Sequence, residues 1–424
     1  MLKLRRTLRL PGGGAAPIPG RAVLLLGAGI VAALLATTVA LTALWPAHAR
    51  TRVPGGLAAP AHPIRGTVTR VSSYRCPDFV NDGNGEGPRL PQVPVCQTAD
   101  IHMESGPDRG LTLPVEQFGQ SGVPSVAVGN HVLLVRGVAP GGRPVYGFYD
   151  FQRSHVLIVL ALVFAVFVLV VGRWRGVGAL VGLVITWLVL VRFVLPAVIQ
   201  GADPLAVSLV GAAAIVLVVL FVAHGVTTRT ATAVLGTLLS LALVEVVASW
   251  AVHAAALTGL ATDDGAYLQS VIGNVRLRGL LLGGVVIGSL GVLNDVTVTQ
   301  ASAVWEIHGA DPSRRAMDLY RSGMRVGRDH IASTVYTLVL AYAGAALPTL
   351  VLFTLAARPL GQVATAEVVA EEIVRTLVGS IGLIAAVPIT TALAVVVSRA
   401  GVVNTVTDGG GRTAGPTTAP PAGF

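Results

Sequence analysis

An ionisable residue within a long apolar stretch is the strongest indication of chemistry in this sequence. Asp295 lies in residues 279–308, which read GLLLGGVVIGSLGVLNDVTVTQASAVWEIH. Roughly 28 helical residues with a rise of about 1.5 Å each are long enough to cross a hydrocarbon core of about 30 Å. A carboxylate at that depth is costly unless it meets a partner or water, so by default it marks an ion or substrate pathway.

Small and polar residues recur in this stretch at steps of three or four, and on an α-helix they share one face. They are Gly284, Gly288, Gly291, Asp295, Thr299, Ser302 and Glu306. The glycines predict close packing against another helix, of the same chain or of a second copy in a homo-oligomer. The polar half, with the neighbouring Asn294, predicts a pathway for a proton or cation. The alternative is that Asp295 is hydrogen-bonded only for packing.

A second carboxylate, Glu245, lies near the middle of another apolar stretch, with Ser249 and His253 at i+4 and i+8. Two carboxylates at membrane depth could share a proton or a cation, and Glu245 and His253 are therefore further candidates for the pathway. Alternatively, neighbouring hydroxyl groups satisfy each carboxylate separately. The sequence does not decide whether the two helices face each other.

The composition predicts an integral membrane protein, since 53% of the 424 residues are hydrophobic and 12% are charged. The formal charge of +9 does not indicate nucleic-acid binding, because the arginines flank apolar stretches instead of forming patches interleaved with aromatic residues. The expected partner is the lipid bilayer. The sequence has no HExxH, no Walker loop and no Gly-x-Ser-x-Gly elbow. We therefore expect no enzyme, no cofactor and no metal site.

Eight apolar stretches predict an α-helical polytopic membrane protein with about eight transmembrane helices. They are residues 22–45, 155–171, 177–199, 204–224, 231–257, 279–304, 331–355 and 372–397. Arginines in short loops favour the cytoplasmic side, so both termini are expected in the cytoplasm of a plasma-membrane protein, with residues 46–153 outside. Arg276 and Arg278 are exceptions to this pattern.

The two ends of the chain are polar. Residues 1–21 are predicted to be a basic cytoplasmic lead and residues 401–424 a disordered tail. Ala47-His48-Ala49 resembles a cleavage site, but the preceding apolar run is too long for a cleaved signal and favours an uncleaved anchor.

The link after the Asp295 stretch has helical periodicity near residues 312–328. Asp311 and Pro312 predict an N-cap and a first helical residue, and Arg321, Arg325 and Arg328 share one face. The pattern predicts a short amphipathic helix on the inner leaflet, with its arginines toward lipid phosphates. The alternative is a solvated helix whose charge only sets the topology.

Residues 46–153 have the texture of strands and turns. Runs at 66–71, 97–104, 110–115 and 131–138 are β-like, and Gly-, Asn- and Pro-rich segments separate them. The pattern predicts a small extracytoplasmic β-rich domain of the OB-like kind.

The chain resembles the YibE/F family of bacterial multi-pass membrane proteins. The matching residues are Gly291-Val292-Leu293-Asn294-Asp295-Val296, Ser302-Ala303, Glu306-Ile307, Ser322-Gly323-Met324-Arg325-Val326-Gly327-Arg328-Asp329, Leu338-Val339-Leu340-Ala341-Tyr342-Ala343-Gly344 and Leu347-Pro348. The family's architecture also resembles this chain, with a junction at Tyr149-Asp150-Phe151-Gln152-Arg153. Tyr336 departs from the family, where this position is often Asn, and the cysteine pair is not a general feature.

The resemblance implies a membrane location and topology, and family members are described as transporters or exporters of undefined substrate. Our leading hypothesis is a secondary transporter in which Asp295, with Glu245 and Glu306, binds the coupling proton or cation. The alternative is a non-transporting scaffold or sensor whose extracytoplasmic domain binds a ligand or partner. Deleting residues 60–150 should abolish the response of a sensor, whereas a transporter would keep part of its flux.

We predict that Cys76 and Cys96 form a disulfide. In an oxidising compartment this bond would close a loop of about twenty residues and stabilise the domain by about 3 kcal/mol. The alternative is two unrelated thiols. Alkylation without reductant, followed by mass spectrometry, should leave both cysteines unmodified. Modification of both would contradict the bridge.

Overall fold

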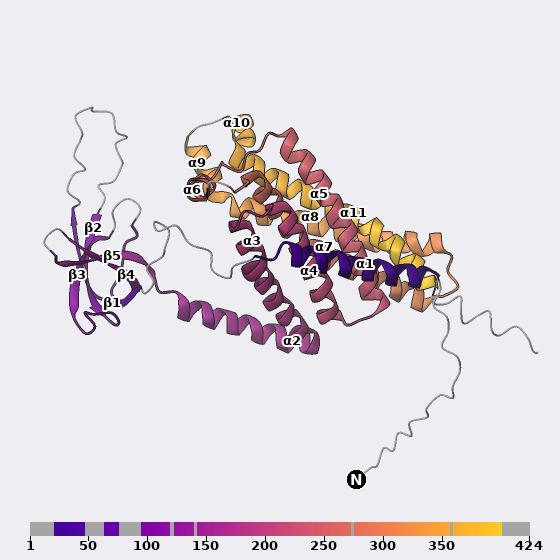
Figure 1. The fold of residues 1–424 in the computed structure, drawn as a ribbon, viewed down its shortest axis with the longest axis horizontal. Coiled ribbons are helices and arrows are strands. Elements are labelled where there is room, and N and C mark those ends of the chain that lie inside the picture. The colour runs from indigo at the N-terminus through magenta and orange to yellow at the C-terminus, as the bar shows by residue number, and fades with distance from the viewer. Residues whose placement is uncertain are drawn as a thin grey trace, which may run out of the picture. The chain divides into compact units, whose positions relative to one another are not determined.

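The chain folds into two compact units, which are described separately. The computed structural model describes residues 21–46, 63–75, 95–118, 123–139, 142–272, 275–356 and 359–400. One unit is Arg52–Val168, and the other joins Met1–Thr51 to Leu169–Phe424. The first contains all the described strands and the second contains most of the described helices (Figure 1).

The strand unit is a single antiparallel sheet. Its strands are β1 (Ile64–Arg75), β2 (Val95–Met103), β3 (Thr112–Phe118), β4 (His131–Val138) and β5 (Pro144–Phe151), in the order β3-β2-β1-β4-β5. The two edge strands β3 and β5 also approach each other, so the sheet curls strongly. The four predicted strands are confirmed: the run at 131–138 coincides with β4, and the other three have shifted ends. β5 was not predicted, because Pro144 and Gly147 interrupt its apolar pattern.

One face of the sheet forms a compact apolar core. Alternate residues such as Val132 and Leu134 of β4 are fully buried, and Phe148 packs edge-on against Phe118 at 5.3 Å between ring centroids. Tyr146 donates a hydrogen bond to Asp108, and burial together with this carboxylate raises the pKa of the Tyr146 phenol. The core therefore holds β5 in place despite its weak sequence signal.

The segment that leaves the sheet is held by a local ion pair. A guanidinium nitrogen of Arg153 lies 2.7 Å from Asp150 and the Arg153 side chain lies over the ring of Phe151. Arg153 and the backbone N–H of Phe151 lower the pKa of the Asp150 carboxyl. Of the predicted cysteine pair, Cys96 is buried in β2 and Cys76 lies outside the described residues, so the disulfide stays a prediction.

The remaining elements are helical. They are α1 (Arg21–Ala43), α2 (Ser154–Val189), the π-helical turn η1 (Leu190–Val194), α3 (Leu195–Ile199), α4 (Pro204–His224), α5 (Thr228–Ala254), α6 (Asp263–Val271), α7 (Leu277–Ala310), α8 (Ala316–Ala345), α9 (Leu347–Leu355), α10 (Leu360–Thr365) and α11 (Glu367–Ala400). In the described part of the chain six helices are long and apolar enough to cross a membrane, or seven if α8 and α9 form one bent span. The prediction of several apolar spans is confirmed.

The difference from eight spans arises in α2. The helix and its continuation, Ser154–Ile199, form one span candidate of 46 residues. Inside it Arg173 is non-helical, with φ 51° and ψ −130°. The predicted boundary between residues 171 and 177 falls at this break.

The link after α7 corrects two predictions. The helix expected near residues 312–328 and the span expected from residue 331 form a single helix, α8, so no separate short helix lies between them. Asp311 is not an N-cap. It follows the last residue of α7, and its carboxylate accepts hydrogen bonds from the backbone N–H and the hydroxyl of Ser313. These residues form a turn, and the next helix begins only at Ala316. Pro348, at the start of α9, follows the 58° bend that ends α8.

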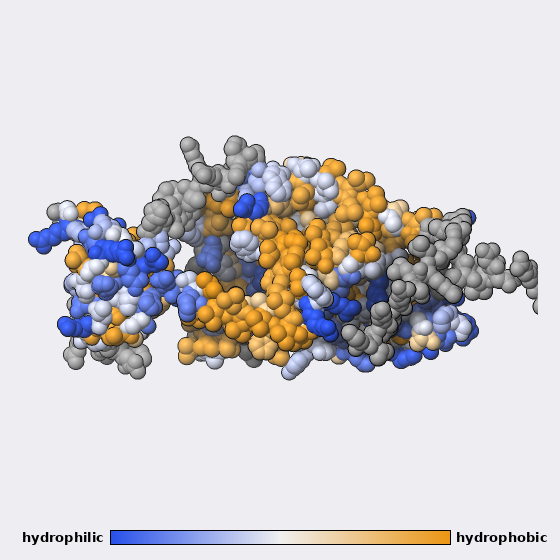
Figure 2. Space-filling view, turned by 90° about the horizontal axis from the view of Figure 1, so that it is seen from below, coloured by the Kyte–Doolittle hydropathy of each residue, from blue (hydrophilic) through white to orange (hydrophobic). Residues whose placement is uncertain are grey.

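The helical core is formed by α5, α7 and α11, with α4 and α8 packed against it. Glycines allow the closest approaches: a Cβ added to Gly382 would lie 2.2 Å from Cγ2 of Val244. Much of the outer surface is apolar, as Figure 2 shows over the middle of the visible helical face. Large apolar side chains such as Trp250 (71% exposed) and Leu355 (78%) point outward. An apolar exterior is what a bilayer requires.

We predict that Gly382→Ala destabilises the helical unit, because its new methyl group would overlap Val244. Overpacking of this kind costs about 1–3 kcal/mol. The matched control is Gly379→Ala, one turn earlier on α11, whose Cβ would lie 3.4 Å from Ser289 Oγ in ordinary contact. Thermal unfolding of the purified protein should show a lower midpoint for Gly382→Ala and no loss for Gly379→Ala. Equal midpoints would contradict this packing.

Candidate functional site

Asp295 is paired with a histidine. Its carboxylate oxygen Oδ2 lies 3.6 Å from Nε2 of His330 on α8. The Asp295 side chain is 68% exposed although it lies near the midpoint of α7, and the His330 side chain is 34% exposed. The pair is an ion pair when the imidazole is protonated. His330 immediately precedes the apolar stretch predicted at residues 331–355, and it was not predicted to be part of the site.

The predicted stripe on α7 forms one exposed face. Gly284, Gly288, Gly291, Asp295 and Thr299 are all exposed, and Ser302 is half-buried. A Cβ on Gly284 or Gly291 would meet no described atom within 4 Å, and one on Gly288 would lie 3.3 Å from the hydroxyl of Tyr342. The described chain therefore leaves most of this face uncovered, so packing against a second copy stays open.

Helix α7 packs against α4 through two other glycines. A Cβ on Gly283 would lie 2.3 Å from Ser208 Oγ, and one on Gly279 would lie 3.2 Å from Pro204. The spacing of residues in the sequence did not show whether Gly283 or Gly284 faces the neighbouring helix. The two glycines are adjacent and identical, and they differ only in the side of α7 on which they lie.

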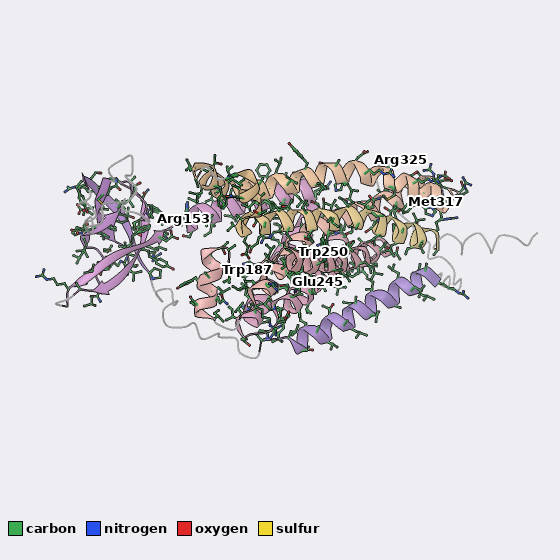
Figure 3. The ribbon with its side chains drawn as sticks, turned by 90° about the horizontal axis from the view of Figure 1, so that it is seen from above. Arg153, Trp187, Glu245, Trp250, Met317 and Arg325 are labelled. Atoms are coloured by element: carbon green, nitrogen blue, oxygen red, sulfur yellow. The ribbon has the colours of Figure 1, made fainter. Side chains whose placement is uncertain are left out.

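Glu245 lies part of the way along α5 (Figure 3). Its Oε1 accepts a hydrogen bond of 2.8 Å from Ser249, and its Oε2 is buried without a hydrogen-bond partner among the described residues. His253 bonds through Nδ1 to the carbonyl oxygen of Ser249 at 2.7 Å. The polar stripe predicted on α5 is therefore present.

The two carboxylates lie on different sides of α7. Thr297 faces α5, where its hydroxyl bonds to Thr237 at 2.7 Å, and Leu293 is fully buried. Asp295 is two residues from each and therefore about 200° around the helix. The structure does not bring Asp295 and Glu245 together.

The other polar residues of α7 that were predicted to form the pathway have different surroundings from Asp295. Glu306 is 77% exposed and lies 3.7 Å from a guanidinium nitrogen of Arg229. Ser302 lines a cavity together with Arg229. Asn294 turns its side-chain oxygen Oδ1 inward, where it is buried without a partner in the described chain.

A buried polar layer crosses the bundle one to two turns from Asp295, and sequence reasoning missed it. Nε2 of Gln300 donates to the carbonyl oxygen of Gly323 at 2.8 Å and to Oγ1 of Thr391 at 2.7 Å. Gly327 lies beside Gln300, since a Cβ there would come within 3.0 Å of Oε1 of Gln300 and within 2.3 Å of Val387. Gln300 thus ties α7 to α8 and α11. In the sequence, Gln300 directly follows Thr299 and therefore lies on a different face of the helix from the stripe. This offset was the available signal.

The arginines predicted to contact the inner leaflet lie on the first half of α8. Figure 3 shows Arg325 and Met317 toward one end of this helix. Arg325 donates to Ser322 at 2.8 Å, and Arg321 lines a polar groove with Arg314. Arg328 is exposed. In the described ranges no cluster of three or more His, Cys, Asp or Glu residues could hold a metal ion.

The comparison with known proteins identifies a family. The model of the family described as YibE/F-like protein matches residues 160–400, more than half of the chain. The match covers α7, α8 and α11, and so Asp295, His330 and Gln300. No curated protein and no solved structure matches the chain.

We predict that Gln300→Leu destabilises the bundle by about 1–3 kcal/mol, because it leaves a buried carbonyl and hydroxyl without this donor. Thr299→Val is the control, since Thr299 is adjacent in sequence but exposed. Denaturant or thermal unfolding in detergent should separate the two variants. A Gln300→Leu protein as stable as Thr299→Val would show that the layer contributes nothing.

Proposed function

The chain belongs to the YibE/F-like protein family, and we propose that it is a secondary transporter or exporter in which Asp295 and His330 carry the coupling proton or cation. The observation that carries the proposal is the 3.6 Å pair on an exposed face midway along an apolar helix. A carboxylate in that position must meet water, an ion or a partner.

At this distance, a change in the charge of Asp295 or of His330 changes the attraction between the two side chains. A proton taken up by Asp295 would remove the charge that holds His330, and a cation between α7 and α8 would replace the imidazolium. Either event would weaken the link between the helices at that depth. The second half of α8 is suited to respond, because most of its residues from Ser333 onward are exposed or only half-buried.

Glu245 is the second group assigned to the pathway. Its buried, unpartnered Oε2 supports a proton-binding role on the opposite side of α7. Glu306 is assigned a supporting role at the end of the helix, where it lies 3.7 Å from a guanidinium nitrogen of Arg229. The two carboxylates act in sequence in this scheme, since they do not share one site.

We propose eight spans in the plasma membrane. Dividing Ser154–Ile199 at Arg173 and counting α8 with α9 as one bent span adds two to the six long helices. A helix of 46 residues would be about 69 Å long, more than twice the hydrocarbon thickness. Both termini are then cytoplasmic and the sheet is extracytoplasmic.

The two arginines that are exceptions to the charge pattern both have partners close to them in the structure. Arg276 lies 2.8 Å from Asp203, and Arg278 donates to the carbonyl oxygen of Leu257 at 3.0 Å.

We propose that the strand unit is an OB-like barrel. Five antiparallel strands with approaching edges β3 and β5 match a small, partly open barrel. In a sensor or scaffold, the alternative function, this barrel would be the ligand-binding part.

Proton flux tests the proposal. Proteoliposomes that contain an internal pH indicator and a mixture of small-molecule candidate substrates should take up protons under an imposed membrane potential. Asp295→Asn should lower the rate about 100-fold, the usual contribution of a positioned proton-transfer group. His330→Gln should reduce the rate in the same direction.

The matched control is Asp318→Asn, which removes the same charge from an exposed ion pair with Arg315 at the start of α8. It should leave the flux unchanged. Membrane insertion of all variants is checked by protease protection. A wild-type rate retained in Asp295→Asn would rule out the assigned role.

A further inference from the structure

A basic cavity lies where α4 ends, α5 begins and α7 approaches its end. Its volume is about 390 Å³. The residues that line it are Arg175, His224, Thr227, Thr228, Arg229, Thr230, Ala233, Val298, Ser302 and Trp305. The lining contains two guanidinium groups, an imidazole and four hydroxyl groups, and it contains no carboxylate.

The positive charge of the cavity is only partly compensated. Arg229 lies 3.7 Å from Glu306, but that carboxylate is 77% exposed and does not line the cavity, so water screens the pair. Among the described residues no ion pair involves Arg175, which follows the break at Arg173. The cavity therefore has capacity for an anion.

The backbone N–H groups at the start of α5 add further hydrogen-bond donors, which carry partial positive charge. Thr227 caps α5, and its hydroxyl accepts a hydrogen bond from the backbone N–H of Thr230. The first N–H groups of a helix have no intrahelical acceptor, and the helix dipole favours negative charge at this end. With two guanidinium groups beside them, these donors match the several oxygens of a phosphate group.

An apolar groove continues from the cavity. Val23, Leu26 and Ile30 of α1 line it with Phe221 and Ala231, and it shares Thr227 and Thr228 with the basic cavity. An acyl chain fits a groove of this chemistry. A phosphate next to an apolar groove is the arrangement of a phospholipid.

We propose that the basic cavity binds the phosphate group of an anionic phospholipid. The adjoining groove would hold an acyl chain of that lipid, which favours the lipid over a free phosphate anion. Asp295 and His330 do not line the cavity, so this site is separate from the proposed coupling pair.

Native mass spectrometry of the full-length protein in detergent tests the proposal. The probes are phosphatidylglycerol, phosphatidylcholine as the zwitterionic comparison, and inorganic phosphate at constant ionic strength. Arg175→Gln and Arg229→Gln should each weaken retention of phosphatidylglycerol at least about tenfold, since each removes a charge-assisted contact. Arg229→Lys should keep part of the binding and shows whether a loss arises from misfolding.

The control is Arg276→Gln, which removes a basic residue outside the cavity and without a predicted lipid contact, and this variant should bind phosphatidylglycerol as the wild type does. Asp295→Asn should also bind normally, so failure of the transport proposal and failure of this one are distinguishable. Binding of inorganic phosphate that depends on Arg175, without lipid retention, would support the anion site and overturn the lipid assignment. Binding of both probes unchanged in both glutamine variants would overturn the site.

Discussion

A charged group inside an apolar bilayer must be hydrated, neutralised or paired, and this requirement determines how the helical unit can work. Asp295 satisfies it only in part, because His330 lies 3.6 Å away while most of the carboxylate side chain remains exposed. Lipid cannot supply the missing contacts. The exposed face around Asp295 therefore needs water, an ion or another protein surface, and the transport proposal assigns the first two.

The rest of the bundle is built to hold α7 in place beside that face. Gly382 lets α11 approach Val244 of α5, and Gly327 lets α8 approach Val387 of α11. Gln300 then connects α7 to both α8 and α11 by hydrogen bonds inside the core. Toward its second half, α8 has far fewer buried residues. His330 lies at the boundary between a firmly packed first half of α8 and a loosely packed second half.

The sequence predicted what depends on period and composition. The apolar helices, the exposed stripe of α7 and the polar stripe of α5 follow from spacing along one element. Features that depend on a second element were missed: the bonds of Gln300, the partner His330 and the packing through Gly283 instead of Gly284. The N-cap at Asp311 was wrong because its carboxylate bonds to Ser313 in a turn, an option that Asp has equally. Strand β5 depends on tertiary burial of Tyr146.

Water accessibility of the α7 face tests the central claim most directly. In a background with Cys76 and Cys96 replaced by serine, Thr299→Cys places a thiol on that face one turn from Asp295, and Val246→Cys places one on the apolar exterior of α5, where Val246 is 66% exposed. The proposal predicts that a charged, membrane-impermeant thiosulfonate modifies Thr299→Cys and leaves Val246→Cys unmodified. If both thiols react only with a lipid-soluble maleimide, Asp295 faces a dry surface and the transport proposal fails.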